Sequence, residues 1–403
     1  MQDFFPPRYD LVEHALLLAA ARAVVDPGAP EPAAAGADWD AFLALAARNR
    51  LLPLAHRLLS EREDVPESIR SALRAAFAEN GRQALARSAE LRRLIGAMAA
   101  RGVRAAAYKG PALAVRAYGH LALRTYADLD LLVAPDDVPA AARVLEEGGY
   151  VPLHRFSPAQ DAVFRRVDGD YPYHHPHTGA LVELHCHVSS ARFGVALPTA
   201  ELLARARPVP IGGGEVPALA DDDLFLALCL HGAKHRWSRL EWLAAAAALA
   251  VHTRLDLEAI LRRASALGAG RTVLLALLLM RDALGLQSTG SIDRSISADP
   301  ALPALAAEAR ALWFAEDAGE STDALTHSRT HALAALEDTA ANLRFNYRLR
   351  ESAADRARYA ARWLFTPSPE DWAWARLPDP LSPLYRALRP LRLAVRYGPR
   401  RGA

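Results

Sequence analysis

Two acidic residues with a spacing suited to shared chemistry, Asp128 and Asp130, lie in the segment 124–133, which reads Arg-Thr-Tyr-Ala-Asp-Leu-Asp-Leu-Leu-Val. In a strand, alternate side chains point to the same face, so these two carboxylates would face the same way. A cation would offset their repulsion, and carboxylate oxygens are the ligands that Mg²⁺ prefers beside substrate phosphates. The pair predicts a magnesium site; the alternative is that both acids only cap a strand.

A third carboxylate, Glu183, lies in the segment 181–185, which reads Leu-Val-Glu-Leu-His. The apolar residue on each side of it predicts a strand, and on a neighbouring strand Glu183 would complete a site for two metal ions. In that arrangement Asp128 and Asp130 hold both ions and Glu183 holds the ion beside the nucleophile. Glu183 or Asp130 could also accept the proton of the attacking group. The alternative is that Glu183 faces solvent.

The two lysines are the next candidates. Of the 48 Lys and Arg residues, only Lys109 and Lys234 are lysines, and the other 46 are arginines. A compact ammonium and a planar guanidinium suit different geometries, so both lysines are candidates for phosphate binding. Gly110 and Pro111 follow Lys109 and predict a helix start, where free backbone N–H groups also attract anions. The alternative is that both lysines persisted by drift.

A pair of histidines, His231 and His235, flanks Lys234 in the segment 231–237. Residues four apart on a helix share one face, which is the geometry of a zinc-binding pair. The residue after the first histidine is Gly232, where a metalloprotease would carry its glutamate, and no third ligand follows. A helix face that borders the phosphates, or a satisfied core histidine, explains the pair better than zinc.

The elements that would position these residues form an α+β fold. Helical periodicity covers residues 9–98 and about 221–359, and strands are predicted at 103–108, 129–133, 150–156 and 180–188. Between the strands, helices are predicted at 111–119 and 137–147, and the segment 157–179 is predicted to contain a loop or hairpin. The predicted division is an N-terminal helical region (1–100), an α/β core (101–215), a C-terminal helical domain (216–365) and a Pro- and Arg-rich wrapping tail (366–403).

The tail contains an arginine-rich helix at 385–397. We expect Arg386, Arg389, Arg392 and Arg396 to form a solvated face, with Leu388, Leu391 and Val395 packed inward. Contact of the arginines with an acidic partner or a membrane surface is the alternative.

Composition narrows the class of protein. The net charge of +2 gives no strong nucleic-acid signal, and 52 % hydrophobic with 23 % charged residues is an ordinary globular balance. Only two cysteines occur, far apart, which argues against a disulfide framework. No apolar run is long enough to span a membrane, and the first residues do not form a signal peptide. We therefore expect a cytoplasmic protein.

Taken together, these segments resemble the bacterial uncharacterised nucleotidyltransferase family of the DNA polymerase beta-like nucleotidyltransferase superfamily. The resemblance runs from about Trp39 into the tail. It implies a small polymerase-beta-like α/β domain with a mixed sheet. In the superfamily, a Gly-Ser turn at a helix start contacts the nucleotide phosphates, and Lys109-Gly110 takes that place here. The aspartate pair of the family matches Asp128 and Asp130, and its later strand carboxylate matches Glu183.

The resemblance implies a Mg²⁺-dependent nucleotidyltransferase that moves an NMP group from an NTP, with ATP expected, to an unidentified acceptor. Two Mg²⁺ ions are expected, with Mn²⁺ as the alternative. The acceptor is open among a small molecule, a peptide natural product and a protein side chain. The expected nucleotide-binding residues are Lys109, Gly110, Arg124, Lys234 and His235, and His185 and His231 are expected on the acceptor side.

Two positions depart from the family pattern. Cys186 stands where a tryptophan is expected, and an alanine run at 244–248 follows where an acid is expected shortly after Trp242. The missing acid puts the nucleobase pocket in question more than the metal site. Two alternatives therefore stay open: a non-catalytic relative that binds nucleotide or a partner, and a phosphotransferase that uses the same metal site.

Overall fold

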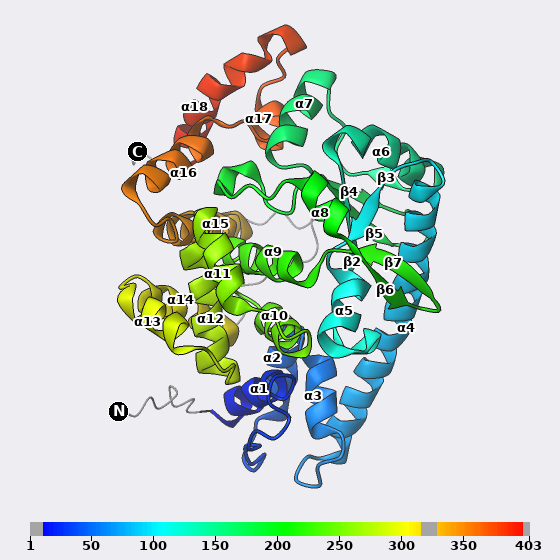
Figure 1. The fold of residues 1–403 in the computed structure, drawn as a ribbon, viewed down its shortest axis with the longest axis vertical. Coiled ribbons are helices and arrows are strands. Elements are labelled where there is room, and N and C mark those ends of the chain that lie inside the picture. The colour runs from blue at the N-terminus through cyan, green and yellow to red at the C-terminus, as the bar shows by residue number, and fades with distance from the viewer. Residues whose placement is uncertain (1–10, 316–328, 398–403) are drawn as a thin grey trace.

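The computed structural model describes residues 11–315 and 329–397, and within them it confirms the α+β fold class. A seven-stranded mixed sheet has the order β3-β4-β5-β2-β1-β7-β6. Figure 1 shows the long helix α4 (Glu67–Ala99) running past the sheet on one side, with the helices from α9 onward on the other. The sheet therefore lies between the two helical parts that the sequence pattern predicted.

The N-terminal part is helical, as predicted. Asp38 caps α2 by accepting a hydrogen bond from the N–H of Ala41, and Pro53 occupies the first turn of α3, where no N–H is needed. The bounds are α1 (Val12–Arg22), α2 (Trp39–Arg48), α3 (Leu52–Leu59) and α4.

The sheet aligns the predicted acids. Strand β2 runs parallel to β5, and the register sets Asp130 opposite Glu183 and Leu132 opposite His185. Strand β1 is antiparallel to β2 and parallel to β7. The strand bounds are β1 (Ala105–Ala107), β2 (Asp128–Val133), β3 (Val151–Pro152), β4 (Asp170–His174), β5 (Leu181–His185), β6 (Arg207–Ile211) and β7 (Gly214–Ala218).

The segment around β4 agrees in part with its prediction. The strand predicted at 150–156 shortens to Val151–Pro152, while β4 and β5 form the predicted hairpin. A helix, α7 (Pro158–Val167), was missed although Ser157 and Gln160 form a capping box at its start. The hairpin of β6 and β7 was also missed, and its turn rests on two glycines at positive φ, Gly212 and Gly213.

Shorter helices connect the strands. The predicted helix after Lys109 is α5 (Gly110–Tyr118), which ends at Gly119 in the left-handed conformation with φ 67°. The predicted helix after the two aspartates at 136 and 137 is α6 (Val138–Glu147). The remaining short elements are α8 (Thr199–Arg205) and the 3₁₀ turns η1 (Leu121–Leu123), η2 (Pro135–Asp137) and η3 (Ala191–Phe193).

The C-terminal helices share a core with the N-terminal ones, because α1 contacts both α10 and α12. The alanine run at 244–248 is fully buried in α10, where small side chains let this helix pack closely on α5. The bounds are α9 (Asp221–Lys234), α10 (Leu240–His252), α11 (Leu257–Ala266), α12 (Gly270–Leu284), α13 (Gly290–Ala298), α14 (Leu302–Phe314), α15 (Arg329–Arg348) and α16 (Ala353–Phe365).

The tail consists of α17 (Pro369–Trp374), η4 (Asp379–Leu384) and α18 (Tyr385–Tyr397), and α18 packs on α16 and α17. Figure 1 shows this group at one end of the molecule, beside α7. The prediction for the face of α18 was wrong at two positions, because Leu391 is 58 % exposed and Val395 is 77 % exposed.

Two arginines of α18 point inward instead. Arg389 and Arg392 are buried, and both form ion pairs with the buried carboxylate of Asp371. That carboxylate supplies the counter-charge, which a periodicity argument from α18 alone cannot include. Leu388 is partly buried against the sheet-side core, as expected.

Two further sequence expectations can be compared with the structure. Cys186 and Cys229 are both buried and free. Among residues 11–315 and 329–397, no helix has the length and apolar character needed to cross a membrane.

Candidate functional site

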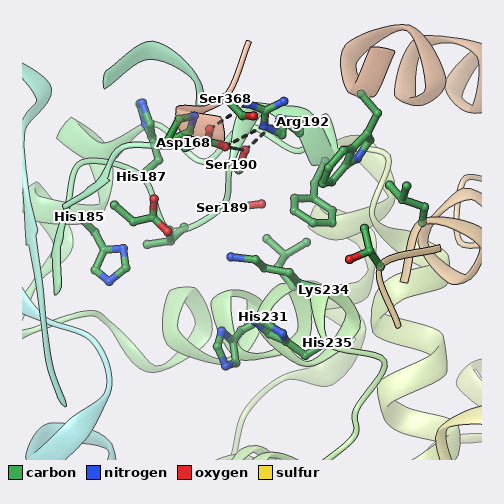
Figure 2. Close-up of a pocket in the computed structure, with 18 of the residues that line it drawn as sticks. Asp168, His185, His187, Ser189, Ser190, Arg192, His231, Lys234, His235 and Ser368 are labelled. Carbon is green, nitrogen blue, oxygen red and sulfur yellow. Dashed lines mark hydrogen bonds and ion pairs between the residues drawn. The ribbon is translucent and has the colours of Figure 1, made fainter. Parts of the chain in front are cut away.

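A cavity of about 1330 Å³ is lined by residues of the strands β2, β4 and β5, of the helices α9 and α10, and of the C-terminal helices α15, α16 and α18. Part of its lining is shown in Figure 2. Nine of the ten predicted site residues line it, and the tenth, Gly110, adjoins Lys109. The nine are Lys109, Arg124, Asp128, Asp130, Glu183, His185, His231, Lys234 and His235.

A cluster that could bind a metal ion lies on the paired strands β2 and β5. Ligand atoms of Asp130, Glu183 and His185 all lie within 4.8 Å of one another. The Nε2 atom of His185 is 3.2 Å from Asp130 Oδ1 and 3.2 Å from Glu183 Oε2. Glu183 and His185 are two residues apart on β5 and share a face, and the parallel register places that face beside Asp130.

Lys109 joins this cluster. Its Nζ lies 2.6 Å from Asp130 Oδ1, and both side chains are buried. Burial opposes the charge of the lysine, but the field of Asp130 outweighs it and raises the pKa of Lys109. The residue predicted to contact phosphates therefore contacts a predicted metal ligand. The second oxygen of Asp130, Oδ2, makes no hydrogen bond with any residue that the structure describes.

The backbone at Lys109 explains why glycine follows. Gly110 has φ +54°, a conformation that side chains rarely adopt, and a Cβ there would lie 3.6 Å from the carbonyl oxygen of Asp128. The close approach of this turn to β2 places the ammonium of Lys109 on Asp130. Tyr108 supports the arrangement, since its ring centre is 4.9 Å from Nζ and its ring meets that of His185 edge-on.

The cluster holds mixed charge. Burial opposes the protonation of His185, but hydrogen bonds to Asp130 and Glu183 outweigh it and raise the pKa of this histidine to about 9. The hydrogen bond from His185 in turn lowers the pKa of Glu183. Asp128 lies on the same face of β2 but outside the cluster of three, and burial raises its pKa. The neighbouring acids Asp130 and Glu183 add to that shift.

Arg124 is held by an acid that the sequence analysis overlooked. Its Nε donates to Oε1 of Glu241 at 2.7 Å, and both residues are buried. Glu241 stands immediately before Trp242, so an acid does serve this region, although from the other side of the tryptophan. Its position in the first turn of α10 was the available signal.

Helix α9 supplies an aromatic and cationic wall. The rings of His231 and His235 lie 5.0 and 5.4 Å from that of Trp242. Burial, together with the charges of Lys234 and Lys109, lowers the pKa of His235 to about 3, so the ring is neutral. Figure 2 shows Lys234 extending into the cavity above both histidines. Among the residues that the structure describes, the ammonium of Lys234 makes no hydrogen bond or ion pair.

The structure does not support zinc binding by His231 and His235. In the described part of the chain, the one group with three close metal-ligand side chains is that of Asp130, Glu183 and His185. Gly232 has a packing explanation, because a Cβ there would lie 2.5 Å from the ring of Trp237. Glycine therefore permits the tight turn between α9 and α10.

A second polar network in Figure 2 ties the tail to the core. Arg192 Nε lies 2.9 Å from Oδ1 of Asp168, and Ser190 donates to the same carboxylate oxygen at 2.7 Å. The remaining nitrogens of Arg192 donate to the carbonyls of Thr366 and Pro367. Every group in this network has a partner, so its role is to fix the tail beside the cavity.

Asp170 and Arg50 are among the cavity residues that sequence reasoning missed. Asp170 on β4 faces Lys234, whose charge opposes the rise in the pKa of Asp170 that burial causes. Arg50 comes from the turn between α2 and α3 and lines the cavity with a half-buried side chain. A strand acid in the segment 170–174 could have been noticed, whereas Arg50 is one of 46 arginines and carries no motif.

The model of a protein family described as uncharacterised nucleotidyltransferase matches residues 35–285, more than half of the chain. The match includes the strands that carry Asp130 and Glu183 and ends before α13, so α15, α16 and the tail lie outside it. No curated protein matches the chain significantly.

Proposed function

The chain belongs to the uncharacterised nucleotidyltransferase family, and from this premise we propose that it moves an NMP group from an NTP, with ATP expected, to an acceptor. The observation that carries the proposal is the parallel register of β2 and β5, which brings Asp130 opposite Glu183 at the cavity. The same cavity is lined by these carboxylates and by the ammonium of Lys234. Such a lining suits a metal–nucleotide complex, because the carboxylates would bind its cations and the ammonium its phosphates.

Asp128, Asp130 and Glu183 are the proposed ligands of two Mg²⁺ ions, with Mn²⁺ as the alternative. The donor set fits, since all three offer oxygen, and Asp130 Oδ2 is not engaged by any described residue. Imidazole suits softer metals, so we assign His185 to holding Asp130 and Glu183 in place through Nε2. When bound, such cations stabilise the charge that develops on the phosphates.

Other side chains of the cavity would hold the metal ligands in place and bind the nucleotide. Lys109 pairs with Asp130 and keeps it ionised, and the start of α5, which follows directly, would offer free N–H groups to a phosphate. Arg124, held by Glu241, and Lys234 would bind phosphate oxygens. His235 is a neutral ring beside Trp242, which suits contact with a sugar or base rather than a second charge.

The acceptor would enter from the side of Glu183 and His185. Glu183 is the most exposed member of the cluster, with 38 % of its side chain accessible, and its lowered pKa keeps it a carboxylate at neutral pH. It can therefore accept a proton from an attacking hydroxyl or amine. His185 and His231 line the same cavity and are the proposed acceptor-side contacts.

The test uses ATP labelled at either the α- or the γ-phosphorus, incubated with the protein, Mg²⁺ and a fractionated cell extract as the source of acceptors. The expected result is label transfer from the α position, with pyrophosphate released and one NMP added to the acceptor by mass spectrometry. The Asp128→Asn variant is the control and should lose most of the transfer.

The other outcomes decide between the alternatives. Transfer from the γ position, with added phosphate on the acceptor, would mean a phosphotransferase. Nucleotide binding without transfer from either position would mean a non-catalytic relative. Neither binding nor transfer would reject the proposal.

A further inference from the structure

The turn between α2 and α3 carries an arginine that no neighbouring acid neutralises. Arg50 lines the cavity, and its guanidinium makes no hydrogen bond or ion pair with any residue in 11–315 or 329–397. Of the acids that act on it, Glu241 already pairs with Arg124, and Asp128 is a proposed metal ligand. Arg239 and Arg124 repel it, and burial together with this repulsion lowers the pKa of Arg50.

The backbone holds Arg50 in an unusual conformation. Its φ is +57°, in the left-handed region where a residue other than glycine is strained by about 1 kcal/mol or more. The preceding residue anchors this turn to two other helices. Asn49 is buried and bonds the carbonyl of Trp313 at 2.9 Å and the N–H of Leu240 at 3.0 Å.

These bonds tie the turn to the start of α10. Leu240 directly precedes Glu241, so the same turn that presents Arg50 also fixes the helix end that holds Arg124. Arg48 adds a bond to the carbonyl of Leu312, which fastens the turn to α14. The anchored turn presents an unneutralised cation to the cavity, and a bound anion would offset that charge.

We propose that Arg50 binds the distal phosphates of the nucleotide, the part that leaves as pyrophosphate. This inference rests on the proposed function and adds the N-terminal helices to the active site. The distal phosphates are the most negatively charged part of a nucleotide, so they suit a site that offers several guanidiniums. Arg50, Arg124 and Arg239 all line the cavity, and Glu241 pairs with Arg124.

The experiment measures the affinity of the full chain for inorganic pyrophosphate with Mg²⁺ by calorimetry, and the melting temperature of each variant. Asn tolerates the left-handed region, so Arg50→Asn removes the charge without adding backbone strain. Arg50→Lys keeps the charge, and Arg57→Gln is the matched control because Arg57 is exposed and outside the cavity lining.

We expect Arg50→Asn to weaken pyrophosphate binding about tenfold or more, the scale of a charged hydrogen bond. Its melting temperature should be unchanged or higher, since the variant loses an unpaired half-buried charge and a strained conformation. Arg50→Lys should recover part of the affinity, and Arg57→Gln should equal the wild type.

Two results would overturn the inference. One is pyrophosphate affinity within twofold of the wild type in Arg50→Asn, and the other is a loss of affinity accompanied by a lower melting temperature, which would make Arg50 a structural residue. The proposed function fails by different readouts, because labelled transfer and its loss in Asp128→Asn do not depend on Arg50. Intact transfer with unchanged pyrophosphate affinity in Arg50→Asn would reject only the present inference.

Discussion

Two buried carboxylates, Asp130 in the cavity and Asp371 next to it, differ in how many of their oxygens are hydrogen-bonded. Asp371 uses both oxygens: Arg392 binds Oδ1, while Arg389 and the N–H and hydroxyl of Ser368 bind Oδ2. Asp130 receives Lys109 and His185 on Oδ1 alone, and Oδ2 has no partner in the described residues.

This difference distinguishes a carboxylate that stabilises the fold from one that is available to bind a cation. A buried carboxylate whose lone pairs are all satisfied contributes to the fold, and removing it leaves cations unpaired. A carboxylate with an open oxygen, beside two other acids and facing a cavity, has unused capacity to bind a cation. Burial alone would rank Asp371 and Asp130 together, at 1 % and 3 % exposed.

The largest expected effect is the loss of activity when an acid beside Asp130 is replaced. Asp128→Asn removes a carboxylate whose pKa is raised by burial, so the folded protein should not lose stability. Loss of a metal ligand should lower kcat/KM about a thousandfold or more, roughly 4 kcal/mol of transition-state stabilisation. Steady-state kinetics and a melting curve check both halves. Activity within tenfold of the wild type would remove Asp128 from the metal site.

For Asp371 we expect the opposite result, a loss of stability with little change in activity. Asp371→Asn leaves Arg389 and Arg392 without their shared carboxylate and should lower the free energy of unfolding by about 3 kcal/mol or more. The catalytic constants of the folded fraction should change little. Denaturant unfolding and kinetics below the melting transition measure this, with Asp136→Asn as an exposed control. A variant that keeps its stability but loses kcat would place Asp371 in the chemistry instead.

The comparison also explains what the sequence could predict. Asp128 and Asp130 could be found because a strand repeats every two residues, and the period alone sets both on one face. The residues that complete the site around these acids come from other strands and helices. No local pattern encodes the register of β5 against β2 or the position of Glu241 beside Arg124.

The errors have the same origin. Arg389 and Arg392 of α18 turn inward because of Asp371 on α17. Arg50 reaches the cavity from a turn that Asn49 fastens to α14 and α10. The α+β class, the α5 turn and most helices depend on local signals such as caps, glycines and periodicity, and these were predicted correctly. The division of the chain into four parts and the roles of the site residues stay predictions.

A smaller effect is expected at Glu183. It accepts from His185 but is the most exposed acid of the cluster, so Glu183→Gln should cost little stability. If it assists the attacking group, kcat should fall about a hundredfold while KM changes less, because its role belongs to the transition state. Initial rates across ATP concentrations separate the two constants. Equal losses in nucleotide affinity and kcat would instead make Glu183 a binding residue.

The smallest effects are expected from exchanging each lysine for arginine, a change that keeps the charge. Lys109→Arg must place a longer, forked cation in the buried space where Nζ meets Asp130 Oδ1 at 2.6 Å and the ring of Tyr108 at 4.9 Å. The fork would displace His185 or cover the open oxygen of Asp130, so kcat/KM should fall at least about tenfold, or 1.4 kcal/mol. Lys234 is exposed in the cavity, where a guanidinium has room. Lys234→Arg should therefore show a smaller loss, mainly in KM. Both variants should be measured in parallel. If Lys109→Arg left kcat/KM unchanged, Asp130 would need only a positive charge beside it. The distinction between its open and occupied oxygens would then lose its main support.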